Sequence, residues 1–284
     1  MKKSFCSFVS ALFFVHLVFA QDYIPTVAEI KHFPQTKTVM ILEDKLLSEY
    51  NSRLQEIVPV EWTATSYDFL SWKNFDAHRK DRSLSFLILN KVTFEKDKSN
   101  AQYQFMSLLL GGNSKGLSDM PDLCSVPLAY YGEPEESYIY KIGIFLRFIQ
   151  NHVKVITNDP SVASKNIMEH YNKNIQRLSG KTLYLIADEL ARDVNTEAKI
   201  KAVYDGPFKL VTQDDIQKAI ADKNPNVVFL HKVGPGKSQT NARCYKILVG
   251  ADDAQFYYFD YHKIDNRSPD GFLASDFKKL SRKN

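Results

Sequence analysis

KTLYLIADEL, the segment Lys181–Leu190, matches an earlier segment of the chain, KTVMILEDKL at Lys37–Leu46. Lys, Thr, Asp and Leu recur at the same places, and the apolar run between them is kept. An apolar run of this length bounded by polar residues is typical of a buried β-strand. The recurrence therefore suggests that the second half of the chain repeats the first.

The segments that follow each match occur in the same order. An apolar strand ends in FLILNKV in the first half and in VVFLHKV in the second, which places Lys91 and Lys232 at matching strand ends. The next strands, YQFMSLLLGG and RCYKILVGAD, stop at Gly111 and Gly250. An aromatic strand and a closing helix follow in both halves. The predicted unit is strand, helix, strand, helix, strand, strand, strand, helix.

Each half also contains a helix-start signal. Thr65–Asp68 and Thr212–Asp215 have the spacing of a capping box, in which a hydroxyl and a carboxylate satisfy the free amides of a first helical turn. The first box predicts a helix through FLSWKNFDAHRK and the second a helix through IQKAIADK.

The pattern predicts an α/β protein built by internal tandem duplication. Strands joined through helices pair in parallel, whereas the last strands, joined by short polar turns, form an antiparallel hairpin at the sheet edge. Each unit is then a mixed sheet flanked by helices. We expect a first domain at 21–156 and a second at 157–284, with a bridging helix at 159–179 that starts at Asp159-Pro160.

The first 20 residues resemble a secretory signal peptide. Two lysines precede an apolar run, and Val18-Phe19-Ala20 allows cleavage ahead of Gln21. A retained membrane anchor is the alternative, but the run is short for a span of about 20 residues. A second apolar stretch, 138–156, is interrupted by three basic residues and predicts a core helix. We expect an exported protein, periplasmic or secreted, that is not integral to a membrane after cleavage.

The composition excludes several classes of function. With 44% hydrophobic and 25% charged residues, the 284-residue chain can bury a core and is not disordered. Removal of Lys2 and Lys3 with the leader lowers the formal net charge from +4 to +2, and no basic stripe predicts nucleic-acid binding. The histidines show neither HxxxH nor HExxH spacing. We therefore expect no metal and no cofactor.

Four residues are candidates for ligand binding because they lie at strand ends. Asp44 and Asp188 follow the first strand of each unit, and the carboxyl ends of parallel strands are where α/β sheets bind ligands. The alternative is that each aspartate caps a helix. Lys91 and Lys232 would lie at the same edge and could hold an anionic ligand together with an aspartate. A solvated lysine at a strand end is the alternative.

Ser114 lies in Gly112–Gly116, which has the letters of the G-x-S-x-G nucleophile motif. That motif needs a helix directly after the serine, and no helical periodicity follows here. We predict a loop instead. The segment Gly111–Cys124 is the main place where the first unit is longer than the second, and such loops often carry function. We predict that it contacts a partner.

Cys124 and Cys244 remain in the mature chain and could form a disulfide in an oxidising compartment. They do not occupy equivalent places in the two units, so two free thiols used as small apolar residues are the alternative.

These features predict an exported, non-catalytic tandem α/β protein that binds an unidentified protein or small molecule. One alternative is a secreted hydrolase whose catalytic residues are dispersed along the chain. The other is a structural module that associates with itself. A pocket of polar groups with perturbed pKa values would favour the enzyme. An exposed apolar patch would favour a protein partner.

Overall fold

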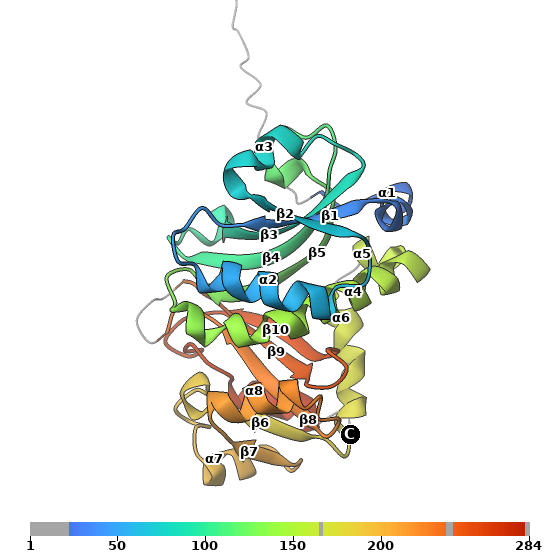
Figure 1. Ribbon diagram of the computed structural model, residues 1–284. Helices are drawn as coiled ribbons and strands as arrows, with labels where there is room; N and C mark the ends of the chain where they lie inside the picture. The colour runs from blue at the N-terminus through green and yellow to red at the C-terminus, as the bar shows by residue number, and fades with distance from the viewer. Residues whose placement is uncertain (1–22, 165–166, 237–240, 282–284) are drawn as a thin grey trace, which may run out of the picture.

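The computed structural model describes residues 23–164, 167–236 and 241–281, which form two five-stranded mixed sheets (Figure 1). The strand order is β2-β1-β3-β4-β5 in the first sheet and β7-β6-β8-β9-β10 in the second. The strands of the first sheet are β1 (Lys37–Leu42), β2 (Tyr67–Ser71), β3 (Leu84–Thr93), β4 (Gln102–Leu110) and β5 (Asp122–Tyr130). Those of the second are β6 (Thr182–Leu185), β7 (Phe208–Leu210), β8 (Val227–Val233), β9 (Arg243–Gly250) and β10 (Phe256–Lys263).

The pairing is the same in both sheets. The first strand of each unit lies between two parallel neighbours, β2 and β3 or β7 and β8. The fourth strand pairs antiparallel with the third and fifth strands. The predicted fold class, a tandem of mixed sheets with a parallel start and an antiparallel edge, is confirmed.

The helices also occupy matching places in the chain. The first unit has α2 (Glu49–Glu61), α3 (Phe75–His78) and α4 (Ile142–Asn158), and the second has α7 (Glu197–Lys201), α8 (Gln213–Ala221) and α9 (Ala274–Ser281). A short α1 (Val27–His32) precedes the first sheet. No helix among the described residues is long and apolar enough to cross a membrane.

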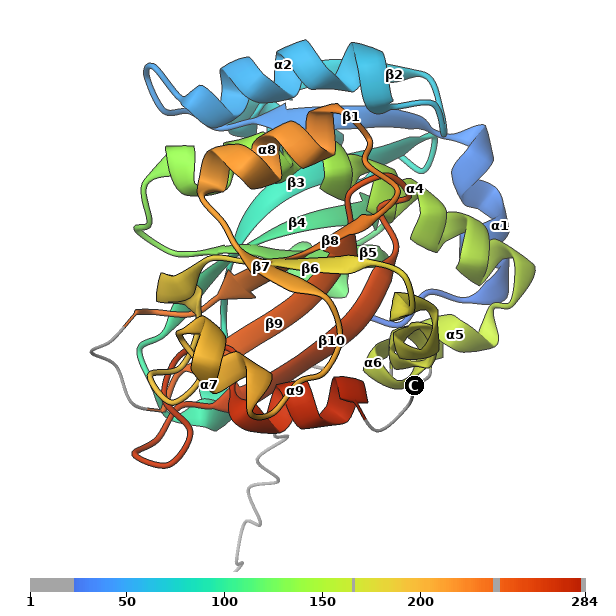
Figure 2. The same cartoon turned by 90° about the horizontal axis from the view of Figure 1, so that it is seen from below.

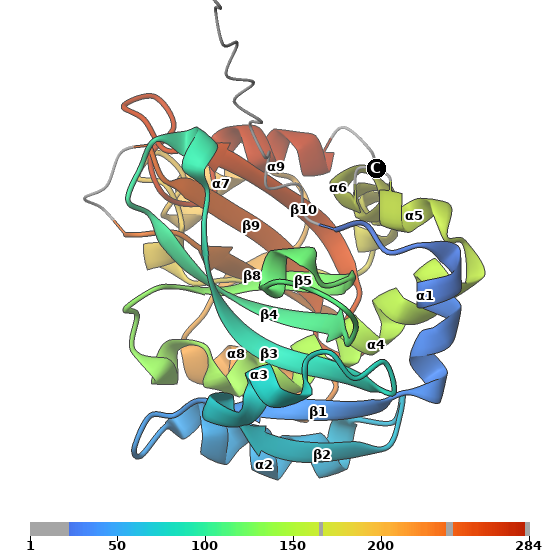
Figure 3. The same cartoon turned by 90° about the horizontal axis from the view of Figure 1, so that it is seen from above.

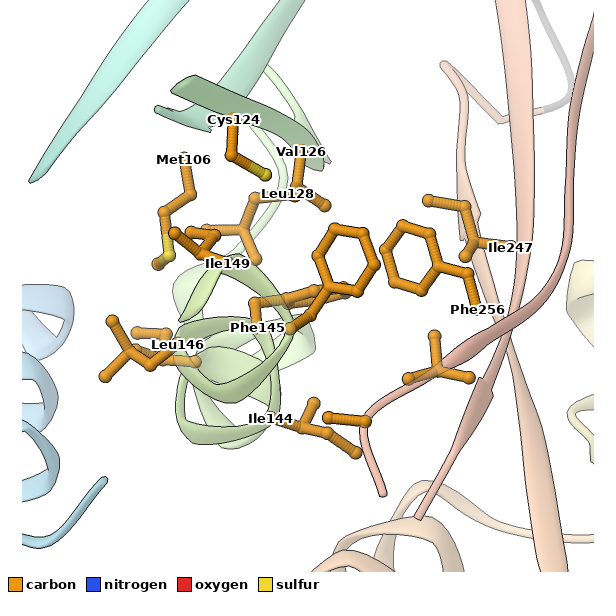
Figure 4. Packing of buried hydrophobic residues seen from close by; sticks show 14 of the residues in the cluster. Met106, Cys124, Val126, Leu128, Ile144, Phe145, Leu146, Ile149, Ile247 and Phe256 are labelled. Atoms are coloured by element: carbon orange, nitrogen blue, oxygen red, sulfur yellow. The ribbon is translucent and has the colours of Figure 1, made fainter. Parts of the chain in front are cut away.

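The two units pack against each other through different faces. The central hydrophobic cluster combines the α2 and α4 face of the first sheet with the α8 face of the second. Figure 4 shows α4 inserted between strands of both sheets. Phe148 of α4 stacks on Phe256 of β10 with ring centroids 3.5 Å apart. The other face of the second sheet, covered by α7 and α9, encloses a separate cluster.

The matching segments that suggested the duplication are offset by one residue in the fold. The amide of Lys37 donates to Ser83 O, toward β3, and the amide of Thr182 donates to Asn226 O, toward β8. Lys37 therefore corresponds to Thr182 and not to Lys181. Because side chains alternate along a strand, a shift of one residue exchanges the faces. Met40 accordingly packs in the central cluster on the α2 side, whereas its letter match Tyr184 lies on the α8 side.

One of the two capping boxes is correct. Thr212 accepts from the amide of Asp215, and Asp215 accepts from the amide of Thr212, at the start of α8. The box at Thr65–Asp68 is wrong, because Tyr67 begins β2, which pairs with β1. The long helix of this unit lies earlier, in α2, where the Ser48 hydroxyl accepts from the amide of Asn51.

The bridging segment 159–179 is not one continuous helix in its described parts. It contains α5 (Ser161–Ser164), α6 (Ile167–Asn172) and the 3₁₀ segment Lys173–Leu178. Asn172 donates to Phe259 O and accepts from Phe259 N, at 3.0 and 2.7 Å, and Asn174 donates to Phe256 O at 2.8 Å. The segment thus covers the β10 edge, which would otherwise present unpaired backbone groups.

Candidate functional site

A groove of about 440 Å³ lies between α1 and the connection from β4 to β5. Its lining includes Tyr23, His32, Arg82, Gly112, Ser114 and Pro121. It is found at the edge of the first sheet where β1 and β3 begin, because Leu110 pairs with Ser85. Figure 3 shows the blue segment that leads into α1 beside the green connection between the two strands.

The walls of the groove are fixed by local interactions. On one side Thr26 and Glu29 form the capping box that starts α1. On the other side the chain leaves β4 at Gly111, where a Cβ atom would lie 2.0 Å from Asp81 O. Only glycine fits so close to the backbone. The amide of Asp122 donates to Tyr23 O at 3.3 Å and joins the two walls.

Arg79 holds the β4–β5 connection in place through hydrogen bonds. Its Nη1 donates to Ser114 O and, at 3.1 Å, to Ser114 Oγ, while Nη2 donates to Lys115 O at 3.0 Å. A 3₁₀ turn, Leu117–Asp119, follows the serine instead of the helix that a nucleophile elbow needs. In the described part of the chain, the other hydrogen-bond partner of Ser114 Oγ is Gly112 O, and no histidine contacts it.

The groove offers both polar and apolar contacts. His32 Nε2 lies 2.9 Å from Arg82 O, and Glu29 accepts from the hydroxyl of Tyr23. The guanidinium of Arg82 has no ion pair or hydrogen bond among the described residues, while Pro121 contributes an apolar surface. The carboxylates of Glu29 and Asp119 also line the groove, so a ligand with both carbonyl and N–H groups and an apolar side chain would suit it.

A second cluster of polar side chains is buried at the carboxyl ends of β6 and β8. Lys232 Nζ lies 2.5 Å from Asp270 Oδ2, which also accepts from the amide of Gly236 at 2.9 Å. Glu189 Oε2 and Asp270 Oδ1 are buried without a hydrogen-bond partner in the described ranges. Lys141, from the start of α4, is 3% exposed.

The charges in this cluster act on one another. Burial raises the pKa of Glu189, and the ammonium groups of Lys141 and Lys232 oppose that rise only in part. Burial lowers the pKa of Lys232, but Asp270, Cys244 and Glu189 together more than offset it, so the net pKa is raised. Asp270 and Lys232 are therefore held as an ion pair inside the protein. None of these groups lines the groove beside α1.

The two aspartates singled out in the sequence are not helix caps. Ser48 caps α2, and Asp44 instead accepts a hydrogen bond from the hydroxyl of Ser71. Asp188 is exposed in the 3₁₀ turn Ala187–Glu189, and the helix that follows, α7, has Thr196 at its N-cap.

The two lysines are not equivalent. Lys37 pairs with Leu84 and Thr182 with Val227, so the residue that corresponds to Lys232 is Leu89, two positions before Lys91. Lys91 Nζ lies 4.6 Å from the centre of the Tyr131 ring and forms no ion pair with Asp44 among the described residues. Of these two lysines, only Lys232 pairs with an aspartate among the described residues, and the sequence does not predict its partner Asp270. The sequence Ser-Pro-Asp-Gly at that point indicates a turn but gives no sign of the contact.

Cys124 and Cys244 are free and buried, and both belong to the central hydrophobic cluster. The disulfide considered from the sequence is not formed, and the alternative of two apolar thiols describes the fold. Within residues 23–164, 167–236 and 241–281, no group of three or more His, Cys, Asp or Glu side chains could hold a metal ion.

Comparison with protein-family models, with curated proteins and with solved structures gives no match for this chain. Its function must therefore be argued from its own residues.

Proposed function

We propose that the protein is a non-catalytic binding protein whose ligand, a short peptide segment, occupies the groove between α1 and the β4–β5 connection. The observation that carries the proposal is the position of the groove at the connection where the two units differ most. The second unit links β9 to β10 by the short turn Ala251–Gln255, whereas the first uses residues 111–121. A volume near 440 Å³ is in the range of pockets that bind small ligands.

The residues that line the groove favour binding of a peptide over catalysis. Arg82 and Asn113 can contact the carbonyl or carboxylate groups of a peptide, and Leu110 and Pro121 can contact an apolar side chain. Ser114, the residue with the sequence context of a nucleophile, donates toward a backbone carbonyl and accepts from Arg79. A cation beside the hydroxyl cannot remove its proton, so the contact lacks the general base that activates a serine.

The groove can be blocked without disturbing the fold. A Cβ atom on Gly112, which lines the groove, meets nothing within 4 Å, and the same is true of Gly116, which does not line it. We expect Gly112→Trp to weaken binding of peptides from a fluorescent tetrapeptide library by 10-fold or more, about 1.4 kcal/mol, in fluorescence polarisation. Gly116→Trp, the matched control, should bind like the wild type.

Two results would contradict this proposal. Equal loss of binding in both tryptophan variants would place the site elsewhere. Hydrolysis of the library by the wild type that disappears in Ser114→Ala would support the alternative of a secreted hydrolase.

We also propose that binding takes place outside the cytoplasm. The support is the signal-peptide pattern of residues 1–20, which lies outside the described residues. Mass spectrometry of the mature protein should find Gln21, or a residue within a few positions of it, at the amino terminus. Recovery of an intact Met1 in a membrane fraction would refute export by cleavage.

A further inference from the structure

Two adjacent leucines project from the loop between β1 and α2. Leu46 is 89% exposed and Leu47 is 90% exposed, so neither contributes to the core. The loop follows the carboxyl end of β1. It lies at the edge of the first sheet opposite the groove between α1 and the β4–β5 connection. Figure 2 shows it extending past the sheet beside the green connection between β5 and α4.

The backbone conformation of Leu47 is unfavourable for leucine, so this residue does not stabilise the fold. Its φ is 58°, in the left-handed region that glycine adopts freely and that branched or bulky L-residues avoid. Glycine at this position would remove both the strain and the exposed apolar surface. A strained and exposed side chain that does not help the fold indicates a role in recognition.

Acidic side chains are frequent in the leucine loop and in the connection that contacts it. The loop and the β5–α4 connection are held together by Glu135, which pairs with Lys45 and accepts from the amide of Tyr50 at 2.8 Å. The segments 43–49 and 131–137 together contain one lysine and six carboxylates: Glu43, Asp44, Glu49, Glu133, Glu135 and Glu136. Glu49, Glu133 and Glu136 are exposed, and within the described residues none of the three forms an ion pair.

Aromatic side chains extend the apolar surface along the same edge. β1, β2 and β5 all end there, since β5 runs parallel to β3. Trp72, directly after β2, is 37% exposed and stacks on Phe75, and Tyr131, directly after β5, is 47% exposed. The edge therefore combines exposed apolar groups with an excess of negative charge.

We propose that Leu46, Leu47, Glu49, Glu133 and Glu136 form an acidic leucine surface that docks a basic amphipathic helix of a partner protein. The apolar side of such a helix would cover the two leucines, and its lysines or arginines would contact the carboxylates at the rim. The charge selects this occupant. An anionic membrane surface, which also attracts exposed leucines, would be repelled by the same carboxylates.

The test uses the full mature chain and two labelled synthetic helices, one made of Leu and Lys and one with the same pattern of Leu and Glu. In fluorescence anisotropy we expect the Leu/Lys helix to bind and the Leu/Glu helix not to bind. Leu46→Ser/Leu47→Ser and, separately, Glu133→Lys/Glu136→Lys should each weaken binding by 10-fold or more. Val60→Ser is the matched control, because Val60 is 70% exposed but lies at the far end of α2.

Leu47→Gly separates recognition from folding. We expect it to bind the Leu/Lys helix more weakly while its melting temperature stays equal to that of the wild type or rises. A fall in melting temperature would mean that Leu47 serves the fold, and would overturn the proposal.

Other outcomes would also overturn it. Equal binding of both helices, or equal loss of binding in Val60→Ser, would show a nonspecific surface. Binding to phosphatidylglycerol vesicles that is lost in Leu46→Ser/Leu47→Ser would assign the surface to a membrane. Concentration-dependent self-association that is lost in the same variant would assign it to a second copy of the chain.

Discussion

The two units share one topology but use it differently at corresponding positions of their sheets. Leu89 of β3 lies opposite Met106 of β4, and both are buried beneath α2 and α4. The corresponding pair in the second unit is Lys232 of β8 opposite Lys246 of β9. Facing lysines repel each other, so the second unit must supply carboxylates to the same buried face.

Those carboxylates come from the segment after β10. Asp270 pairs with Lys232, and Asp276 of α9 pairs with Lys246 through both oxygens, at 2.8 Å each. The same segment closes the carboxyl edge, where Leu190 bridges to Phe272 and is 5% exposed. The equivalent edge of the first unit exposes Leu46 and Leu47. The second edge is therefore closed by buried contacts, while the first leaves apolar side chains exposed, as the proposed docking surface requires.

The largest expected effect comes from breaking the ion pair inside the closed edge. Asp276→Ala leaves Lys246, which is 1% exposed, without a partner and removes the acceptor of the Leu273 amide. We expect the free energy of unfolding, measured by urea denaturation, to fall by about 3–5 kcal/mol.

A double variant tests whether apolar side chains, which fill the corresponding positions of the first unit, can replace the buried ion pair of the second. Lys246→Met/Asp276→Leu should regain most of the loss expected for Asp276→Ala, because a buried ion pair can often be replaced by packed apolar groups. The part that remains comes from the Leu273 amide and the Tyr258 hydroxyl, which both lose Asp276 as an acceptor. Asp222→Ala is the control, since Asp222 and its partner Lys218 form an exposed pair that contacts neither Lys246 nor Asp276 among the described residues. A double variant as unstable as Asp276→Ala would show that the charges have a role beyond balancing each other.

The next effect concerns the connection that distinguishes the first unit. Met120 is 1% exposed and packs with Phe75 and Phe86 in a cluster on the outer face of the first sheet. Met120→Ala should lower the free energy of unfolding by about 2–4 kcal/mol. Leu117→Ala, at a partly buried position beside the same cluster, should cost less. Equal and small effects of both would mean that the loop is separable from the core.

This packing revises how the loop can be tested. From the sequence alone, replacing the loop by the second unit's turn GADDAQ is expected to leave thermal melting nearly unchanged. Because that replacement would delete Met120, the structure predicts a loss of stability that would obscure any loss of binding. Filling the groove at Gly112 avoids the problem.

The sequence predicts the fold better than the candidate sites, for a physical reason. The parallel start and antiparallel edge of each sheet follow from apolar runs and turns, which are local patterns. Residue equivalence depends on register, which the letters cannot fix. The letters align Lys91 with Lys232, whereas the strand register makes Leu89 the equivalent of Lys232. Contacts such as that of Lys232 with Asp270 join residues 38 apart, and Asp270 lies in the irregular connection after β10.

Exposure is the other property that the sequence did not reveal. Leu46 and Leu47 are of a residue type that is usually buried, and only the position of the loop beyond the sheet exposes them to solvent. The groove beside α1 could be predicted in part, because the longer connection was recognised in the sequence. The contribution of Tyr23 and His32 to it depends on how α1 packs.

The smallest expected effect is a pH dependence of stability that comes from Glu189, at the closed edge of the second unit. Glu189 is held near Lys141, Lys232 and Asp270, and burial raises its pKa above the ordinary value of 4.5. A carboxyl group with a raised pKa in the folded state favours folding while it is protonated. That contribution is complete below pH 4.5 and is lost as the pH rises through the pKa of Glu189 in the folded protein.

Glu189→Gln should therefore match the wild type in free energy of unfolding at low pH and exceed it at pH 7. The difference should be smaller than the losses expected for Asp276→Ala and Met120→Ala. The exposed Asp188→Asn should leave the pH profile unchanged. A Glu189→Gln variant that is less stable at pH 7 would show that the ionised carboxylate stabilises the junction, so that the closed edge would depend on three charged partners and not only on the pair of Lys232 and Asp270.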